Sequence, residues 1–216
     1  MPETATTLPL TEAHPRADRN RLVARAQFLA RVGLAWHGIE AAIAIGAGVV
    51  AGSFALIGFG ADSLIEMLAG TVLLWRFAGA RGASDDAEHP AHRLIALTFW
   101  LLAVYVAVEA TRSVVVGHHP EVSYVGIGLA AVTLATMPPL AAAKARVGAQ
   151  LHSSAVKSEG RQTALCAYLS AALLIGLGAN AALGWWWADP AAALVIAAVA
   201  ANEGREAWRG EECCDH

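Results

Sequence analysis

Long apolar stretches separated by short polar segments dominate the chain after its first 30 residues. A helix needs about 20 mainly apolar residues to cross the roughly 30 Å hydrocarbon core of a bilayer. Six stretches meet or approach that length, and they predict spanning helices at 32–51, 54–75, 94–116, 122–143, 163–184 and 189–207. The pattern therefore indicates an all-α membrane protein with six transmembrane helices.

Polar segments set the ends of the predicted spans. They are the turn at Gly52 and Ser53, a charged loop at 81–92, a polar turn at 118–121 and a basic loop at 144–157. The last span opens with Asp189 as the predicted helix N-cap and Pro190 at the first helical position, where a missing N–H breaks no helical hydrogen bond.

The regions outside the spans are polar tails. Residues 1–28 contain several prolines and no periodic apolar pattern, which predicts a disordered cytoplasmic tail before a six-helix transmembrane domain at 29–208. A short cytoplasmic tail at 209–216 carries Cys213, Cys214 and His216, although adjacent cysteines chelate one tetrahedral ion poorly. Lysine and arginine gather before the first span, after the last and in the loops at 81–92 and 144–157, so both termini are predicted to be cytoplasmic.

The composition narrows the class of protein further. Hydrophobic residues make up 56% of the 216 residues and charged residues only 15%, which disfavours a soluble enzyme or a nucleic-acid-binding module. The three cysteines cannot form a secreted disulfide framework, and the sequence has no phosphate-binding loop, GxSxG elbow or HExxH motif. We expect an integral membrane protein, in contact with lipid, of a bacterial-type inner or plasma membrane. We do not expect it to be an enzyme.

Two acidic residues lie near the middle of the second predicted span. Asp62 and Glu66 are four residues apart, so they share one helix face. A carboxylate at the centre of a spanning helix costs about 2.5–3.5 kcal/mol, and neither side chain is long enough to reach water. Two such groups repel each other unless a cation or a shared proton lies between them, which predicts a site that exchanges metal for protons.

Polar groups in the first and fifth spans are further candidate ligands. Gln162 and Cys166 share a face of the fifth span, and Glu159 lies one turn before Gln162. A thiolate binds zinc or cadmium well, but a buried cysteine is also common as a small apolar residue. His37 and Glu40 share a face of the first span; they either complete a metal site and relay protons or form an internal hydrogen bond that stabilises the bundle.

The order and spacing of these motifs resemble the cation diffusion facilitator family of divalent-metal/proton antiporters. The transport site of that family pairs acid-x-x-x-acid in span two with His-x-x-x-Asp in span five, and Asp62 and Glu66 match the first motif. The segment Ala155-Val156-Lys157-Ser158-Glu159 is similar to the Ala-Leu/Val-Lys/Arg-Ala-Asp before the second motif, and Ala188-Asp189-Pro190 fits the opening of span six. This register places Gln162 and Cys166 where the family has His and Asp.

The resemblance implies a short form of the family without its cytosolic C-terminal domain. It implies proton-coupled efflux of zinc or a similar divalent cation by alternating access through a site on spans two and five, in a homodimer. The metal and the protons are substrates, and no cofactor is required. Because Gln162 and Cys166 replace the His and Asp of the family, a second hypothesis stays open: a non-transporting membrane metal-binding or scaffold protein derived from the same family.

Overall fold

A computed structural model describes residues 14–78, 88–117 and 119–209 of the chain. Within these residues the regular secondary structure is entirely helical, as expected for an all-α membrane protein. The six helices are α1 (His14–Ala51), α2 (Phe54–Ala78), α3 (Glu88–Val116), α4 (Tyr124–Leu151), α5 (Ser154–Leu183) and α6 (Ala188–Arg209).

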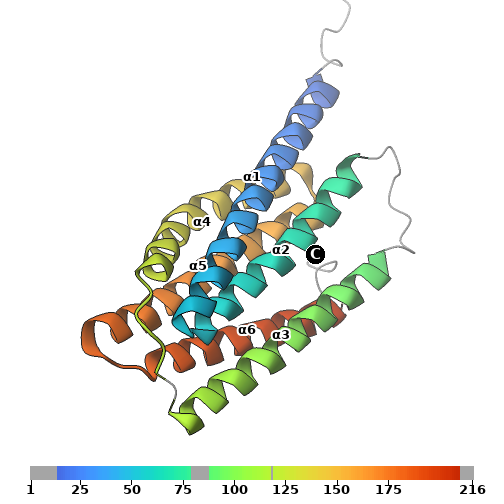
Figure 1. Cartoon of the computed structure of the whole chain (residues 1–216). Coiled ribbons are helices and arrows are strands. Elements are labelled where there is room, and N and C mark those ends of the chain that lie inside the picture. Colours follow the sequence, from blue (N-terminus) through green and yellow to red (C-terminus); the bar gives the residue numbers. More distant parts are fainter. Residues whose placement is uncertain (1–13, 79–87, 118, 210–216) are drawn as a thin grey trace, which may run out of the picture.

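The helices run antiparallel to their neighbours in the chain, as Figure 1 shows. Helices α1, α2, α5 and α4 form a ring in which each packs against the next. Helices α3 and α6 pack together outside the ring, where α3 contacts α2 and α6 contacts both α2 and α5. Helix α1 begins and α6 ends at the same end of the bundle, which we call the terminal end. The start of α1 and the end of α6 therefore lie at one end of the bundle.

Glycine lets α1 and α2 approach closely. A Cβ atom on Gly60 would lie 2.7 Å from the Ile45 Cγ1 atom and 3.0 Å from the Ala44 Cβ atom, closer than side-chain carbons pack. On the other side of this contact, a Cβ atom on Gly48 would lie 2.8 Å from the Ile57 Cγ1 atom. Small residues commonly bring membrane helices together in this way, and here they press the polar face of α1 against that of α2.

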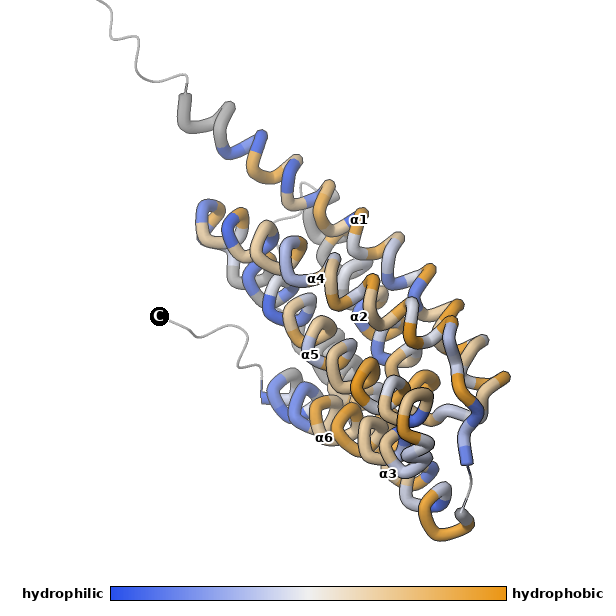
Figure 2. Tube along the Cα trace, turned by 90° about the vertical axis from the view of Figure 1, so that its left-hand side faces the viewer, coloured by the Kyte–Doolittle hydropathy of each residue, from blue (hydrophilic) through white to orange (hydrophobic). Residues whose placement is uncertain are grey.

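The hydropathy of the bundle is that of a membrane protein. Among the residues that the structure describes, four helical segments are long and apolar enough to cross a bilayer, and they belong to α1, α3, α4 and α5. Figure 2 shows apolar residues along the helices and hydrophilic residues gathered near the terminal end. Helices α2 and α6, which are not among the four, carry buried acidic residues that include Asp62 and Asp189. The prediction of an all-α membrane protein is confirmed.

The turns at the end opposite the termini follow the prediction closely. Gly52 has a φ of 64°, which suits glycine, between α1 and α2. Helix α6 begins at Ala188, one residue before the predicted cap. The Asp189 carboxylate accepts a hydrogen bond from the Ser53 hydroxyl, which itself accepts one from the Leu56 N–H. This contact joins the start of α2 to the start of α6.

The prediction of a basic loop at 144–157 is wrong. Helix α4 continues to Leu151, and α5 begins at Ser154 after a turn at His152, whose φ is 51°. Lys144 is buried inside the bundle because it has a partner there, described below. The prolines Pro138 and Pro139 lie within a continuous α4.

The boundary of the predicted N-terminal tail also differs from the structure. Helix α1 begins at His14, so residues 14–28 are helical rather than disordered. This part of α1 contains alanine, arginine and leucine, which have high helix propensity even without an apolar period. Residues 1–13 and the cysteines of the C-terminal tail lie outside the described residues.

Candidate metal centre

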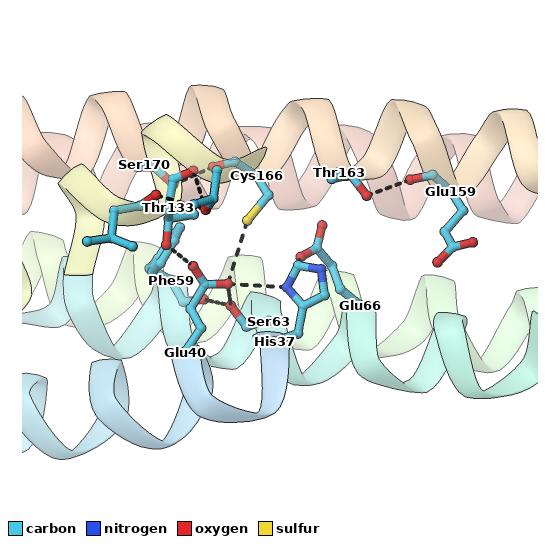
Figure 3. A network of polar contacts seen from close by, with 12 residues as sticks. His37, Glu40, Phe59, Ser63, Glu66, Thr133, Glu159, Thr163, Cys166 and Ser170 are labelled. Atoms are coloured by element: carbon cyan, nitrogen blue, oxygen red, sulfur yellow. Dashed lines mark hydrogen bonds and ion pairs between the residues drawn. The ribbon is translucent and has the colours of Figure 1, made fainter. Parts of the chain in front are cut away.

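Four potential metal ligands meet inside the ring formed by α1, α2, α5 and α4. They are His37, Glu40, Glu66 and Cys166, and one ligand atom from each lies within 4.8 Å of those of the other three. All four residues are buried, with 0–6% of their surface exposed. Figure 3 shows that their side chains point toward one another from different helices.

The helix geometry explains how these residues meet. His37 and Glu40 lie three residues apart on α1, so they share the face that turns into the ring. Glu66 comes from α2, which Gly60 holds close to α1, and Cys166 comes from α5 on the other side. Residues from three helices therefore surround one point.

His37 lies between the two glutamates. Its Nδ1 atom is 3.2 Å from the Glu40 Oε2 atom and 3.0 Å from the Glu66 Oε2 atom. The internal contact between His37 and Glu40 that the sequence suggested is present, and Glu66 joins it. The imidazole therefore touches both acids of the group, and a proton on Nδ1 can be shared between them.

Glu40 is the most connected residue of the group. Its Oε2 atom accepts hydrogen bonds from the Ser63 hydroxyl, at 2.9 Å, and from the Cys166 thiol, at 3.8 Å. Its Oε1 atom accepts a hydrogen bond from the Thr133 hydroxyl of α4. Hydrogen-bonding side chains from α2, α4 and α5 therefore orient a carboxylate that is shielded from water.

Sequence reasoning missed Ser63 and Thr133. Hydroxyl residues in membrane helices commonly bond to a carbonyl in the preceding turn, as Ser63 also does with the Phe59 carbonyl at 3.2 Å. Their presence in a span therefore gives little signal of a site. The closeness of Ser63 to Asp62 and Glu66 along α2 was the one available indication.

The remaining predicted ligands lie around this group. Asp62 is buried and precedes Glu66 by one turn of α2, on the side away from the terminal end. It is not among the four clustered residues. Gln162 is partly buried one turn of α5 before Cys166, on the terminal side. Glu159 lies nearer still to the terminal end, where its Oε1 atom is 2.8 Å from the Lys144 Nζ atom.

A family model for the cation efflux transmembrane domain matches residues 30–209. The chain belongs to the cation efflux family. Members of this family transport divalent cations across membranes and are not enzymes, which agrees with the resemblance seen in the sequence. A search of curated proteins gave no match.

Within a cation efflux protein, the chemistry of the four-residue group suits a metal ion. Imidazole, thiolate and carboxylate are the groups that bind zinc, with bond lengths of about 2.0–2.3 Å. Ligand atoms around a tetrahedral zinc ion then lie roughly 3.3–3.8 Å from one another. The ligand atoms of the group lie within 4.8 Å of one another, and His37 Nδ1 lies 3.0 and 3.2 Å from the two glutamates, so small shifts would bring the separations into this range.

Proposed function

We propose that this protein exports zinc or a similar divalent cation in exchange for protons, by alternating access through the group formed by His37, Glu40, Glu66 and Cys166. The observation that carries the proposal is the convergence of these four ligand atoms within 4.8 Å in the buried interior of the bundle. Family membership supports the transport of divalent cations in general. The nature of the ligands supports the choice of metal.

A mixed set of nitrogen, sulfur and oxygen ligands favours zinc or cadmium. Thiolate is a soft ligand and imidazole suits zinc, whereas magnesium and calcium prefer oxygen ligands alone. Cys166 supplies the sulfur and His37 the nitrogen, so the His and Asp of the family in the fifth span are replaced in part by a residue from α1. We propose that this exchange preserves a four-ligand site.

Proton exchange follows from the burial of the acids. Metal binding needs ionised carboxylates and a thiolate, while an empty site shielded from water favours their protonated forms. Two protons have the same charge as one divalent cation, so replacing the ion by two protons keeps the buried charge constant. His37, in contact with both Glu40 and Glu66, is suited to pass a proton between them.

The polar residues beside the four-residue group suggest the order in which a transported cation would meet its ligands. Gln162 lies one turn from Cys166 toward the terminal end, and Asp62 lies one turn from Glu66 toward the opposite end. A cation that moves from the terminal end would pass Gln162, then the four-residue group, then Asp62. We assign the terminal end to the cytoplasm of a bacterial-type inner or plasma membrane because lysine and arginine gather there, and we expect the transporter to act as a homodimer.

Proteoliposomes loaded with a zinc-sensitive dye test this proposal and its alternative, a non-transporting metal-binding or scaffold protein. We expect saturable zinc uptake that a pH gradient drives and that the Glu66→Gln variant lacks. A matched control is Glu109→Gln, because Glu109 lies on α3 beside Arg112, outside the ring, with its Oε1 atom 3.7 Å from the Arg112 Nη1 atom. Zinc binding without uptake would favour the scaffold.

A further inference from the structure

A buried ion pair lies between the four-residue group and the terminal end. The Lys144 side chain is 2% exposed, and its Nζ atom lies 2.8 Å from the Glu159 Oε1 atom and 3.1 Å from the Thr163 Oγ1 atom. The Thr163 hydroxyl donates to the Glu159 carbonyl, so its oxygen remains available to accept from the ammonium. The positive charge of Lys144 is thus held by one carboxylate and one hydroxyl oxygen.

The ion pair lies on the same helix faces as the group. Thr163 and Glu159 precede Cys166 by three and seven residues on α5, about 5 and 10 Å along the helix axis. On α1, Gly33 precedes His37 by one turn, and a Cβ atom at Gly33 would lie 2.9 Å from the Lys144 Nζ atom. Glycine at this position therefore leaves space for the ammonium inside the ring.

The second helix lies beside Glu159 at the same level. Gly70 follows Glu66 by one turn on α2, and a Cβ atom there would lie 3.9 Å from the Glu159 Oε1 atom. On both α1 and α2, the residue one turn from the ligand toward the terminal end is thus a glycine. At this level the ring encloses the Lys144 ammonium and the Glu159 carboxylate, and the Leu34 Cδ1 atom lies 3.9 Å from the same Cβ position at Gly70.

A buried ion pair at this place calls for a functional explanation. Removing two charges from water is costly, and apolar side chains of similar volume often give equal or greater stability. The oxygens that hold Lys144, a carboxylate and a hydroxyl, are also ligands for a partly hydrated divalent cation. The Glu159 side chain is 14% exposed, so it is not fully closed off from solvent.

We propose that Glu159 and Thr163 form an access site for the transported cation, and that the Lys144 ammonium occupies this site as a tethered cation until a metal ion displaces it. This inference rests on the proposed function, because it gives the cation a binding step before the four-residue group. Metal and ammonium exclude each other at the site because both require the Glu159 carboxylate. The displaced ammonium must move toward water, which its flexible side chain allows.

Counting tightly bound Zn²⁺ ions tests this directly. Equilibrium binding is measured on purified protein that carries Cys213→Ser and Cys214→Ser, so that the tail thiols do not contribute. We expect one ion per chain in this parent and two when Lys144→Met is added, since the access site is then free. Adding Glu159→Gln to the Lys144→Met variant should return the count to one. As a control, Lys157→Met, at an exposed lysine, is added to the parent alone and should leave its count at one.

The outcomes separate this inference from the proposed function. A parent that binds one ion, with no second ion after Lys144→Met, overturns the access site and leaves the central group in place. A parent that binds none, with one ion after Lys144→Met that Glu159→Gln removes, supports the access site and contradicts the central group. Absence of binding in every variant overturns both.

A measurement on the unaltered protein covers the case in which Lys144→Met does not fold. The chain has two lysines, the buried Lys144 and the exposed Lys157. Acetylation by an N-hydroxysuccinimide ester, followed by mass spectrometry, should modify Lys157 and spare Lys144 without metal. Saturating Zn²⁺ should speed acetylation of Lys144 several-fold and leave Lys157 unchanged; a Lys144 rate that does not respond to Zn²⁺ overturns the proposal.

Discussion

The Nδ1 atom of His37 lies 3.0 Å from the Oε2 atom of Glu66, and this contact joins α1 to α2 in the interior of the bundle. Glu66 belongs to the acidic pair that matches the transport motif of the family, whereas His37 lies on a helix outside that motif. The contact gives the acid a partner that can hold a proton when no metal is bound and bind the metal when it is. We therefore expect α1 to take part in transport.

Glu66 should be essential for metal binding. The Glu66→Gln variant keeps the size of the side chain but removes the negative charge, so we expect Zn²⁺ affinity to fall about 100-fold or more. Isothermal titration calorimetry on purified protein measures this loss. Glu109→Gln on α3 is the control and should bind Zn²⁺ normally; equal affinity in both variants would exclude Glu66 as a ligand.

Cys166 should set the preference between soft and hard metals. In the Cys166→Asp variant a carboxylate replaces the thiolate, which restores the residue of the family motif. We expect the ratio of cadmium to zinc affinity to fall about tenfold, or about 1.4 kcal/mol, because cadmium gains more from sulfur. Competition between the two ions at equilibrium measures the ratio. An unchanged ratio would indicate that the thiol does not touch the metal.

Metal binding should release protons. Because the buried group keeps its total charge when two protons are replaced by one divalent cation, we expect about two protons per Zn²⁺ near neutral pH. Calorimetry in buffers with different ionisation enthalpies gives this number from the slope of the observed enthalpy. A slope of zero would mean that the acids and the thiol are already ionised in the empty protein, against the proposed exchange.

Close packing of α1 on α2 should be needed for the site. In Gly60→Ala the new methyl group would lie 2.7 Å from the Ile45 Cγ1 atom, so the helices must separate. We expect a loss of about 1–3 kcal/mol of stability and weaker Zn²⁺ binding, measured by thermal unfolding in detergent and by calorimetry. Gly46→Ala is the control on α1, since a Cβ atom there has no neighbour within 4 Å; equal behaviour of both variants would argue against a role for this contact.

The helices themselves could be predicted largely from the sequence. Long apolar stretches place the spans, and the turn at Gly52 is marked by residue type. The error at 144–157 has a physical cause, because a lysine after an apolar stretch usually marks the membrane surface. Lys144 is instead buried against Glu159, and this pairing across two helices is not visible in a local pattern.

The candidate site could be predicted only in part. The spacing of His37 and Glu40 and of Asp62 and Glu66 indicates which residues share a helix face, since that depends on local geometry. The contact between Cys166 and Glu40 joins residues 126 positions apart, so it depends on how the helices pack. The same packing separates Asp62 from the clustered group, a distinction that the four-residue spacing does not reveal.

The ligands of bound zinc test the central claim most directly. X-ray absorption spectroscopy is measured on the Zn²⁺-loaded protein carrying Cys213→Ser and Cys214→Ser, in which Cys166 is the remaining thiol. We predict one sulfur at about 2.3 Å, with nitrogen and oxygen neighbours at about 2.0–2.2 Å, and loss of the sulfur signal in Cys166→Ser. A zinc ion surrounded by oxygen and nitrogen alone in the protein that retains Cys166 would contradict the four-residue site.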